Sequence, residues 1–219
     1  VSKLPRNRRK LNISVFKIIL VLVLAIVIVG VGAGFGALKG ILDDTPNINA
    51  DALIPKGYKT TLVYQNGKEI TTLANSNSNR EYVYYDSIPE DLVNAFVAIE
   101  DRRFWEHNGI DVQGIARAFI KGLKSGDFDE GASTLTQQLI KNNVFNVGLN
   151  ESTFLDKLER KVQEQYLAVD MEKKIDKKSI VEYYLNTIYL GEGCYGVETA
   201  AKTYFGKELS QLSVSECAV

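Results

Sequence analysis

Apolar and polar residues along the chain follow two periodicities, one typical of helices and the other of strands. Segments 60–64 and 69–73 are rich in β-formers and flank an Asn-Gly pair, which predicts a hairpin, and 81–85 suits a further short strand. Beyond them, apolar residues recur every three or four positions. This spacing predicts helices over 89–109, from about 133, and over 154–171, 178–189, 198–204 and 214–219.

One segment is apolar on every side. Residues 18–38 are 21 positions without a charge, and six basic residues but no acidic one precede them. At about 1.5 Å per residue, such a helix covers roughly 30 Å, the thickness of a bilayer core. We expect one transmembrane helix with its N-terminus in the cytoplasm, where basic flanking residues accumulate. A cleaved signal peptide is the alternative, because the second half of the segment is rich in glycine.

These patterns predict four parts. They are a cytoplasmic basic tail (1–17), the transmembrane helix (18–38), a connector (39–59) and a folded domain (60–219). The folded domain is predicted to be mainly α-helical with a small β element. On the third helix, Leu155, Leu158, Val162 and Tyr166 form one apolar stripe, which should face the core.

Charge and cysteine content exclude some functions. The chain has 219 residues and a net charge of −1, but beyond residue 17 it carries 20 basic and 27 acidic groups. This acidic excess argues against a nucleic-acid partner. Cys194 and Cys217 lack metal-ligand spacing with the single His107, and two unpaired thiols are favoured over one disulfide.

Ionisable side chains gather at 100–109, at the end of a predicted helix. Glu100 lies one turn from Phe96, at the edge of the apolar stripe, where partial burial would suit its carboxylate to act as a base. Asp101 next to it could accept hydrogen bonds at the helix end. The alternative is a salt-bridge cluster that only stabilises the helix terminus.

A second segment combines a hydroxyl, an amide and an ammonium group. Thr134, Gln138 and Lys141 share one face of a helix whose N-terminal N–H groups favour an anion. A phosphate, or a sugar carrying one, would fit this face. The alternative is an ordinary polar face, with a capping box formed by Thr134 and Gln137.

A third segment places Arg160 and Lys161 close to Glu164 on one helix. The simplest interpretation is a helical ion pair. The functional interpretation is a second carboxylate with two cations, suited to glycosyl transfer from a pyrophosphate-linked sugar. The cations would stabilise the charge that grows on the departing pyrophosphate, which needs no general acid.

Four segments resemble, in order, the motifs of the peptidoglycan glycosyltransferases, glycosyltransferase family 51. These enzymes are domains of class A penicillin-binding proteins or monofunctional transglycosylases, and the resemblance covers about residues 55–219. The matching segments read Glu-Asp-Arg-Arg-Phe-x-x-His-x-Gly (100–109), Gly-Ala-Ser-Thr-Leu-Thr-Gln-Gln-Leu-x-Lys-Asn (131–142), Arg-Lys-x-x-Glu (160–164) and Ile-Val-Glu-Tyr-Tyr-Leu-Asn-x-x-Tyr-x-Gly (180–191).

The resemblance implies a lysozyme-like fold and a substrate, lipid II, that is added to a nascent glycan chain with inversion. Glu100 would be the general base for the acceptor 4-hydroxyl. Glu164 would assist at the donor pyrophosphate, directly or through a divalent cation such as Mg²⁺ or Mn²⁺. The implied substrate-binding residues are Asp101, Phe104, His107, Ser133, Thr134, Gln138, Lys141, Arg160 and Lys161.

The resemblance also implies a membrane-facing segment over 112–130, where Phe119, Ile120, Leu123 and Phe128 alternate with Arg117, Lys121 and Lys124. Tyr184 and its neighbours in the last motif look like structural support. No Ser-x-x-Lys transpeptidase signature occurs in the predicted folded domain (60–219), so any transpeptidase domain is expected after residue 219. Two alternatives stay open, a lytic enzyme acting on mature glycan and a catalytically silent scaffold that binds lipid II.

Overall fold

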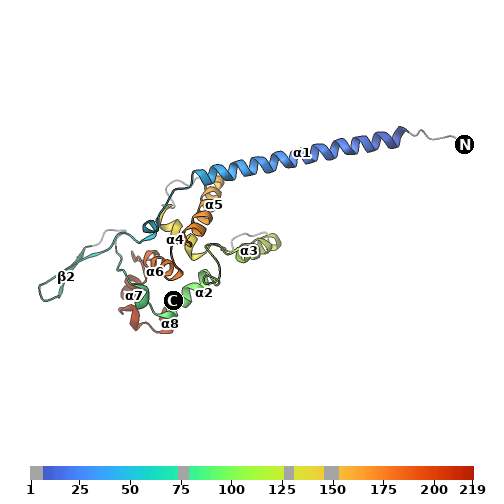
Figure 1. Ribbon diagram of the computed structural model, residues 1–219. Coiled ribbons are helices and arrows are strands. Elements are labelled where there is room, and N and C mark those ends of the chain that lie inside the picture. The colour runs from blue at the N-terminus through green and yellow to red at the C-terminus, as the bar shows by residue number, and fades with distance from the viewer. Residues whose placement is uncertain (1–6, 74–78, 126–130, 146–152) are drawn as a thin grey trace. The chain divides into compact units, whose positions relative to one another are not determined.

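The computed structural model describes residues 7–73, 79–125, 131–145 and 153–219. It divides into two compact units, residues 1–46 and 47–219, which are described separately. The second unit contains the helices α2 (Glu90–Glu100), α3 (Val112–Ser125), α4 (Leu135–Asn143), α5 (Phe154–Met171), α6 (Lys177–Thr187), α7 (Val197–Phe205) and α8 (Val214–Cys217), the strands β1 (Thr60–Val63) and β2 (Glu69–Leu73), and three short 3₁₀ segments (Ala50–Leu53, Tyr85–Ser87 and Leu209–Gln211). The predicted fold class, mainly α with a small β element, is confirmed (Figure 1).

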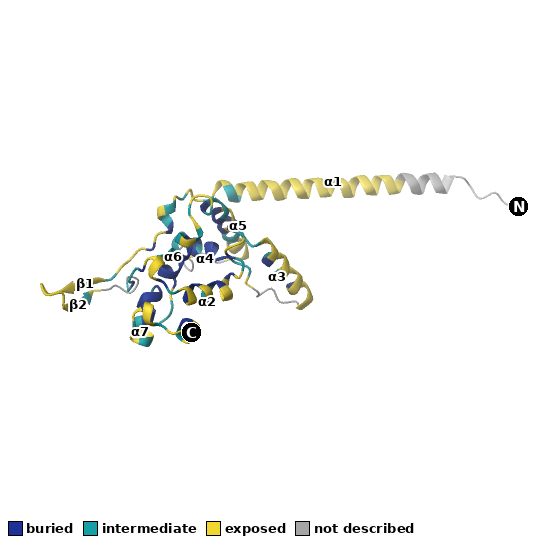
Figure 2. Ribbon diagram, turned by 60° about the horizontal axis from the view of Figure 1, so that its bottom comes forward, coloured by how far each residue is buried: buried dark blue, intermediate teal, exposed yellow. Residues whose placement is uncertain are grey.

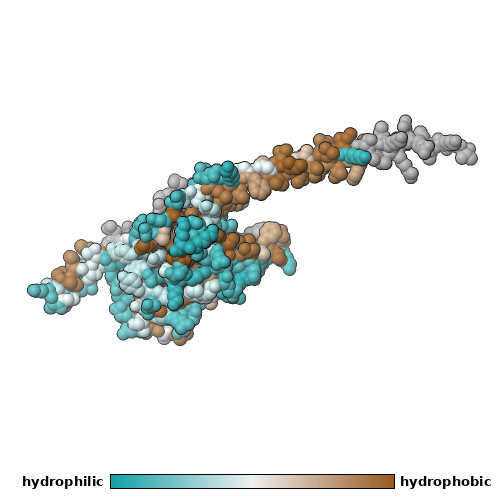
Figure 3. Space-filling model, viewed as in Figure 1, coloured by the Kyte–Doolittle hydropathy of each residue, from teal (hydrophilic) through white to brown (hydrophobic). Residues whose placement is uncertain are grey.

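The first unit is a single long helix, α1 (Asn7–Asp43). Every residue from 15 to 40 is exposed, and Figure 3 shows these side chains as an almost continuous apolar surface. The segment Val15–Asp43 is long and apolar enough to cross a membrane. A signal sequence close to an N-terminus can also be long and apolar enough to meet this criterion.

Helix α4 forms the centre of the second unit and packs against α5 and α6. Its apolar residues Leu135, Leu139 and Ile140 are fully buried, as are Ile180 and Leu185 of α6. Figure 2 shows this concentration of buried residues on α4 and the helices beside it. The packing fixes the first turn of α4 firmly in the domain, which matters because that turn carries one of the sequence motifs.

Local side-chain bonds fix where the helices begin. Thr134 forms the predicted capping box with Gln137, and Thr153 forms another with Asp156 at the start of α5. Asp176 accepts a hydrogen bond from the Ser179 N–H and so caps α6. These residues lie within three positions of the groups they satisfy, so the sequence is sufficient to predict the helix starts.

The first predicted helix ends earlier than expected, at Glu100 and not at Gly109. Asp101 leaves the helix with φ −153°, because its carboxylate is held by His107 and by the Leu135 N–H. Gly109 has another role. Its φ is +91°, and a Cβ there would lie 2.6 Å from the backbone carbonyl of Ala168, so no other residue fits.

Two further expectations are wrong. Residues 81–85 form no strand, because the side chain of Asn186 takes both backbone hydrogen bonds of Val83, at 2.8 Å each. The apolar stripe of α5 faces outwards, with Leu155 70% exposed. The buried face of α5 includes Glu164 and Leu167. Burial of the Glu164 carboxylate is possible because Arg160 and Lys161 form ion pairs with it. Cys194 and Cys217 are buried and unpaired, as predicted.

An ion cluster joins α7 to the segments before and after it. The Lys202 ammonium lies 2.5 Å from Glu81, 2.9 Å from Glu198 and 3.0 Å from Glu208. Burial alone would raise the pKa of Glu81, but hydrogen bonds from Lys202 and Lys59 hold it below its ordinary value. The charged form of Glu81 therefore stabilises the fold at neutral pH, and this contribution is lost as the pH falls through the lowered pKa.

Replacing Lys202 should expose the repulsion between these three carboxylates. We expect Lys202→Met to lower the free energy of unfolding by about 1–2 kcal/mol at pH 7, because the ion pairs are partly solvated. The loss should shrink towards pH 4 as the carboxylates take up protons. Thermal unfolding at both pH values tests this, with the exposed Lys173→Met as control. An equal loss at both pH values would contradict the electrostatic explanation.

Candidate active site

A polar cleft of about 730 Å³ lies at the end of α2. Its walls come from the last residues of α2, the loop that follows, the start of α3 and the start of α4. The lining residues are Ala98, Ile99, Glu100, Asp101, Arg102, Arg103, Asp111, Gly114, Arg117, Gly131, Ala132, Ser133, Thr134 and Gln138. Of the predicted site residues, the cleft thus collects Glu100, Asp101, Ser133, Thr134 and Gln138.

Glu100 is exposed in this cleft, and the expectation of partial burial is wrong. The Gln138 amide donates to the Glu100 carboxylate at 2.8 Å, and the Tyr184 hydroxyl donates to the amide oxygen of Gln138 at 3.2 Å. Burial, and next the Glu100 charge, raise the pKa of the Tyr184 phenol, so it keeps its proton and remains a donor. Tyr184 therefore orients the amide whose NH₂ group faces Glu100, a role that the sequence analysis missed.

Asp101 is buried beneath the cleft and links two motifs. One of its oxygens lies 2.9 Å from His107 Nε2 and accepts the Leu135 N–H at 3.0 Å. His107 and the fully buried Phe104 lie outside the cleft lining, with their rings edge to face at 6.0 Å. These residues shape the cleft from below by fixing the first turn of α4.

At that turn, Thr134 is 1% exposed, and its hydroxyl donates to the Gly109 carbonyl at 2.7 Å while it caps α4. Thr134 thus joins the motif at 100–109 to the motif at 131–142 by a hydrogen bond. Ser133 stands at the cleft wall, where its hydroxyl accepts a hydrogen bond from Lys161 at 3.0 Å. Lys141 is half-buried on α4, outside the cleft lining.

Glu164 is fully buried and does not line the cleft. One of its oxygens accepts from Arg160, and the other accepts from Lys161 at 2.8 Å. Because Lys161 also reaches Ser133, the carboxylate is connected to the cleft wall through an ammonium group. The structure therefore places the two predicted catalytic carboxylates in different settings, one exposed in the cleft and one buried behind it.

The surroundings of Glu164 do not fit a divalent cation. Both of its oxygens are engaged by cationic side chains, and a metal such as Mg²⁺ needs oxygen ligands in place of positive charge. In the described part of the chain, the carboxylates close enough together to bind a metal are Glu81, Glu198 and Glu208, where Lys202 already supplies the positive charge.

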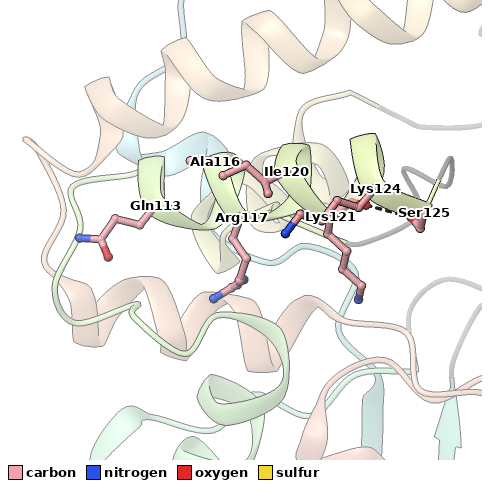
Figure 4. Close-up of a pocket in the computed structure, with 7 residues that line it drawn as sticks. All are labelled: Gln113, Ala116, Arg117, Ile120, Lys121, Lys124 and Ser125. Carbon is pink, nitrogen blue, oxygen red and sulfur yellow. Dashed lines mark hydrogen bonds between the residues drawn. The ribbon is translucent and has the colours of Figure 1, made fainter.

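Basic residues that the sequence analysis did not assign to substrate binding also line the cleft. Arg103 forms an ion pair with Asp111. Burial would raise the pKa of Asp111, but the hydrogen bond from the Gly114 N–H and the Arg103 charge hold this pKa below its ordinary value. Arg117 lines the cleft and also belongs to the basic side of α3, which Figure 4 shows with Lys121 and Lys124. The Glu-Asp-Arg-Arg run and the basic spacing on α3 were the available signals.

Comparison with known proteins decides the family. A family model described as Transglycosylase matches residues 66–219, well over half of the chain. The chain belongs to the transglycosylase family. The predicted resemblance is thus confirmed, and the transglycosylase domain holds all the motif residues described above.

Similar proteins are considerably longer. The chain is 45% identical over 187 residues to a penicillin-binding protein 1A of Clostridium novyi, covering 84% of this chain and 21% of that protein. It is 51% identical over 140 residues to a penicillin-binding protein 1A of Aquifex aeolicus, covering 64% and 18%. A penicillin-binding protein 1F of Bacillus subtilis is 42% identical over 158 residues, covering 72% and 21%. The chain spans about a fifth of the length of these relatives.

Proposed function

We propose that this transglycosylase domain polymerises lipid II into glycan strands by inverting transfer and releases undecaprenyl pyrophosphate. The observation that carries the proposal is the exposed Glu100 carboxylate, which Gln138 contacts in a cleft that Ser133, hydrogen-bonded to Lys161, also lines. A base then lies in the cleft and a cationic group lies directly behind its wall, and transfer from a pyrophosphate donor requires both kinds of group.

In this mechanism Glu100 removes the proton from the acceptor 4-hydroxyl as the oxygen attacks the donor anomeric carbon. The bond to the pyrophosphate oxygen breaks on the opposite face, so the configuration inverts. Lys161 and Arg160, held by Glu164, stabilise the negative charge on the leaving group. Glu164 thus acts through its cations and needs no direct contact with the pyrophosphate.

The membrane supplies a lipid-linked substrate. In our proposal α1 anchors the protein in the bacterial cell membrane, with the N-terminus in the cytoplasm and the catalytic domain outside the cytoplasm. The exposed side chains Phe119, Ile120 and Leu123 of α3 would enter the membrane–water interface, beside the basic residues shown in Figure 4. Phe128, predicted for the same surface, lies outside the described residues. In the full-length protein we expect a transpeptidase domain to follow.

Incubation of the detergent-solubilised chain with labelled lipid II tests the proposed function. We expect polymer, and we expect a phosphoglycolipid that mimics the donor to block its formation. Release of muropeptides from mature cell wall, without polymer from lipid II, would favour a lytic enzyme. The cations at 160 and 161 argue against that alternative, because mature glycan offers no pyrophosphate for them to bind.

Lys141 offers a separate test of donor binding. We expect Lys141→Ala to weaken donor engagement by about 10–100-fold, the value of one charge-assisted hydrogen bond to phosphate. The KM for lipid II and the inhibition constant of the phosphoglycolipid should both rise. Lys157→Ala, an exposed lysine on α5, is the control. Unchanged constants would remove Lys141 from the phosphate site.

A further inference from the structure

A closed ring of polar side chains lies behind the cleft, and it begins and ends on the first turn of α4. From Leu135 the ring passes through the Asp101 carboxylate to His107 Nε2, at 3.0 and 2.9 Å. His107 Nδ1 lies 3.5 Å from the Lys177 ammonium, which lies 2.7 Å from Glu172. The Thr136 hydroxyl donates a hydrogen bond to Glu172, which brings the ring back to α4 one residue beyond Leu135.

The ring is well shielded from water. The exposed fractions of its side chains are 2% for Asp101, 8% for His107, 4% for Glu172 and 22% for Lys177. The Lys177 ammonium also lies 4.2 Å above the ring of the fully buried Phe104, so its position is determined by an aromatic face as well as a carboxylate. Hydrogen bonds in such a shielded setting are strong, and each partner restricts the orientation of the next.

The chemistry of the two neighbours of His107 determines its tautomer. An ammonium group has three donors and no acceptor, so His107 Nδ1 must present its lone pair to Lys177. The ring proton then resides on Nε2 and is donated to Asp101, whose carboxylate can only accept. In the opposite tautomer, an N–H would face the ammonium and a lone pair would face the carboxylate.

We propose that Lys177, held by Glu172, is a positioning residue for the transfer reaction. It fixes His107 in the Nε2–H tautomer, so that Asp101 stays directed at the Leu135 N–H and keeps the start of α4 in place. That helix carries Gln138, which orients Glu100. The inference rests on the proposed function for its kinetic consequence, but the tautomer itself is independent of any activity.

The first experiment reads the tautomer directly. His107 is the single histidine of the chain, so ¹⁵N-histidine labelling of the intact chain in detergent gives one pair of ring-nitrogen signals. At neutral pH we expect a protonated Nε2 and an unprotonated Nδ1. In Lys177→Met we expect a mixture of tautomers or a doubly protonated ring. A wild-type ring protonated on Nδ1, or an unchanged spectrum in the variant, would overturn the proposal whether or not the chain polymerises lipid II.

The second experiment measures the kinetic consequence with lipid II. A displaced Gln138 should misalign Glu100, so we expect Lys177→Met to lower kcat by about 10–100-fold while KM changes little. Lys177→Arg, which also only donates, should restore the tautomer and most of kcat. The exposed neighbour Lys178→Met is the matched control. A rise in KM alone, or an unchanged kcat, would overturn the positioning role.

Glu172→Gln keeps the test decisive if Lys177→Met does not fold. It retains the shape of the side chain and weakens the hold on the ammonium, so it should shift the tautomer populations in the same direction. A loss of kcat with a wild-type His107 spectrum in this variant would also refute the proposed route through the imidazole.

Discussion

Glu100→Gln is expected to lower the rate of lipid II polymerisation by about 10²–10⁴-fold, the usual contribution of a general base. The amide has nearly the same shape as the carboxylate but cannot accept the proton of the acceptor hydroxyl. The carboxylate is exposed in the cleft and makes one described hydrogen bond, to Gln138, so the fold should tolerate the change. Single-turnover polymerisation of labelled lipid II measures the effect.

Binding must be measured beside the rate, because only the proton transfer should be lost. We expect the affinity for the phosphoglycolipid donor mimic to be unchanged in Glu100→Gln. Glu106→Gln is the control, since Glu106 is an exposed carboxylate of the same loop that lies outside the cleft lining. Retention of more than a few per cent of the wild-type rate would remove Glu100 from the role of base. A silent scaffold, by contrast, would keep its biological function after this substitution.

The parts of the fold that local bonds determine could be predicted from the sequence. The starts of α4 and α5 follow from Thr134 and Thr153, whose hydroxyls bond three residues ahead. The end of α2 could not be predicted, because Asp101 leaves the helix for partners far along the chain, among them Leu135. The helical periodicity continues beyond Glu100 although the helix does not, so a pattern of apolar positions alone places the end too late.

For the site, the sequence predicted which segments meet and some of the side chains that face the cleft, but not all of them. Glu100, Ser133 and Gln138 line it, whereas the buried Glu164 lies behind it. The apolar stripe of α5 suggested that the opposite face of this helix was exposed. The face with Glu164 is buried instead, because pairing with Arg160 and Lys161 makes burial of this carboxylate favourable. Hydropathy contains no information about such pairing.

Glu164→Gln should therefore affect both stability and transfer. The amide keeps the shape of the side chain but removes the negative charge that faces Arg160, whose side chain is 12% exposed. Breaking a buried ion pair from one side destabilises a protein by about 3 kcal/mol or more, and we expect a loss of that size in chemical denaturation. The rate of transfer should also fall, because Lys161 is no longer held between Glu164 and Ser133.

A second substitution separates these two effects. Adding Lys161→Met removes one of the two cations that pair with Glu164, so part of the lost stability should return. The transfer rate should stay low, because the ammonium proposed to stabilise the leaving pyrophosphate is then absent. Glu159→Gln, on the same helix, is the control for a charge change alone. If the double variant regained both stability and the wild-type rate, Glu164 would be important only for folding. Other cations would then have to stabilise the pyrophosphate, and Arg102 and Arg117 in the cleft wall would be the next to test.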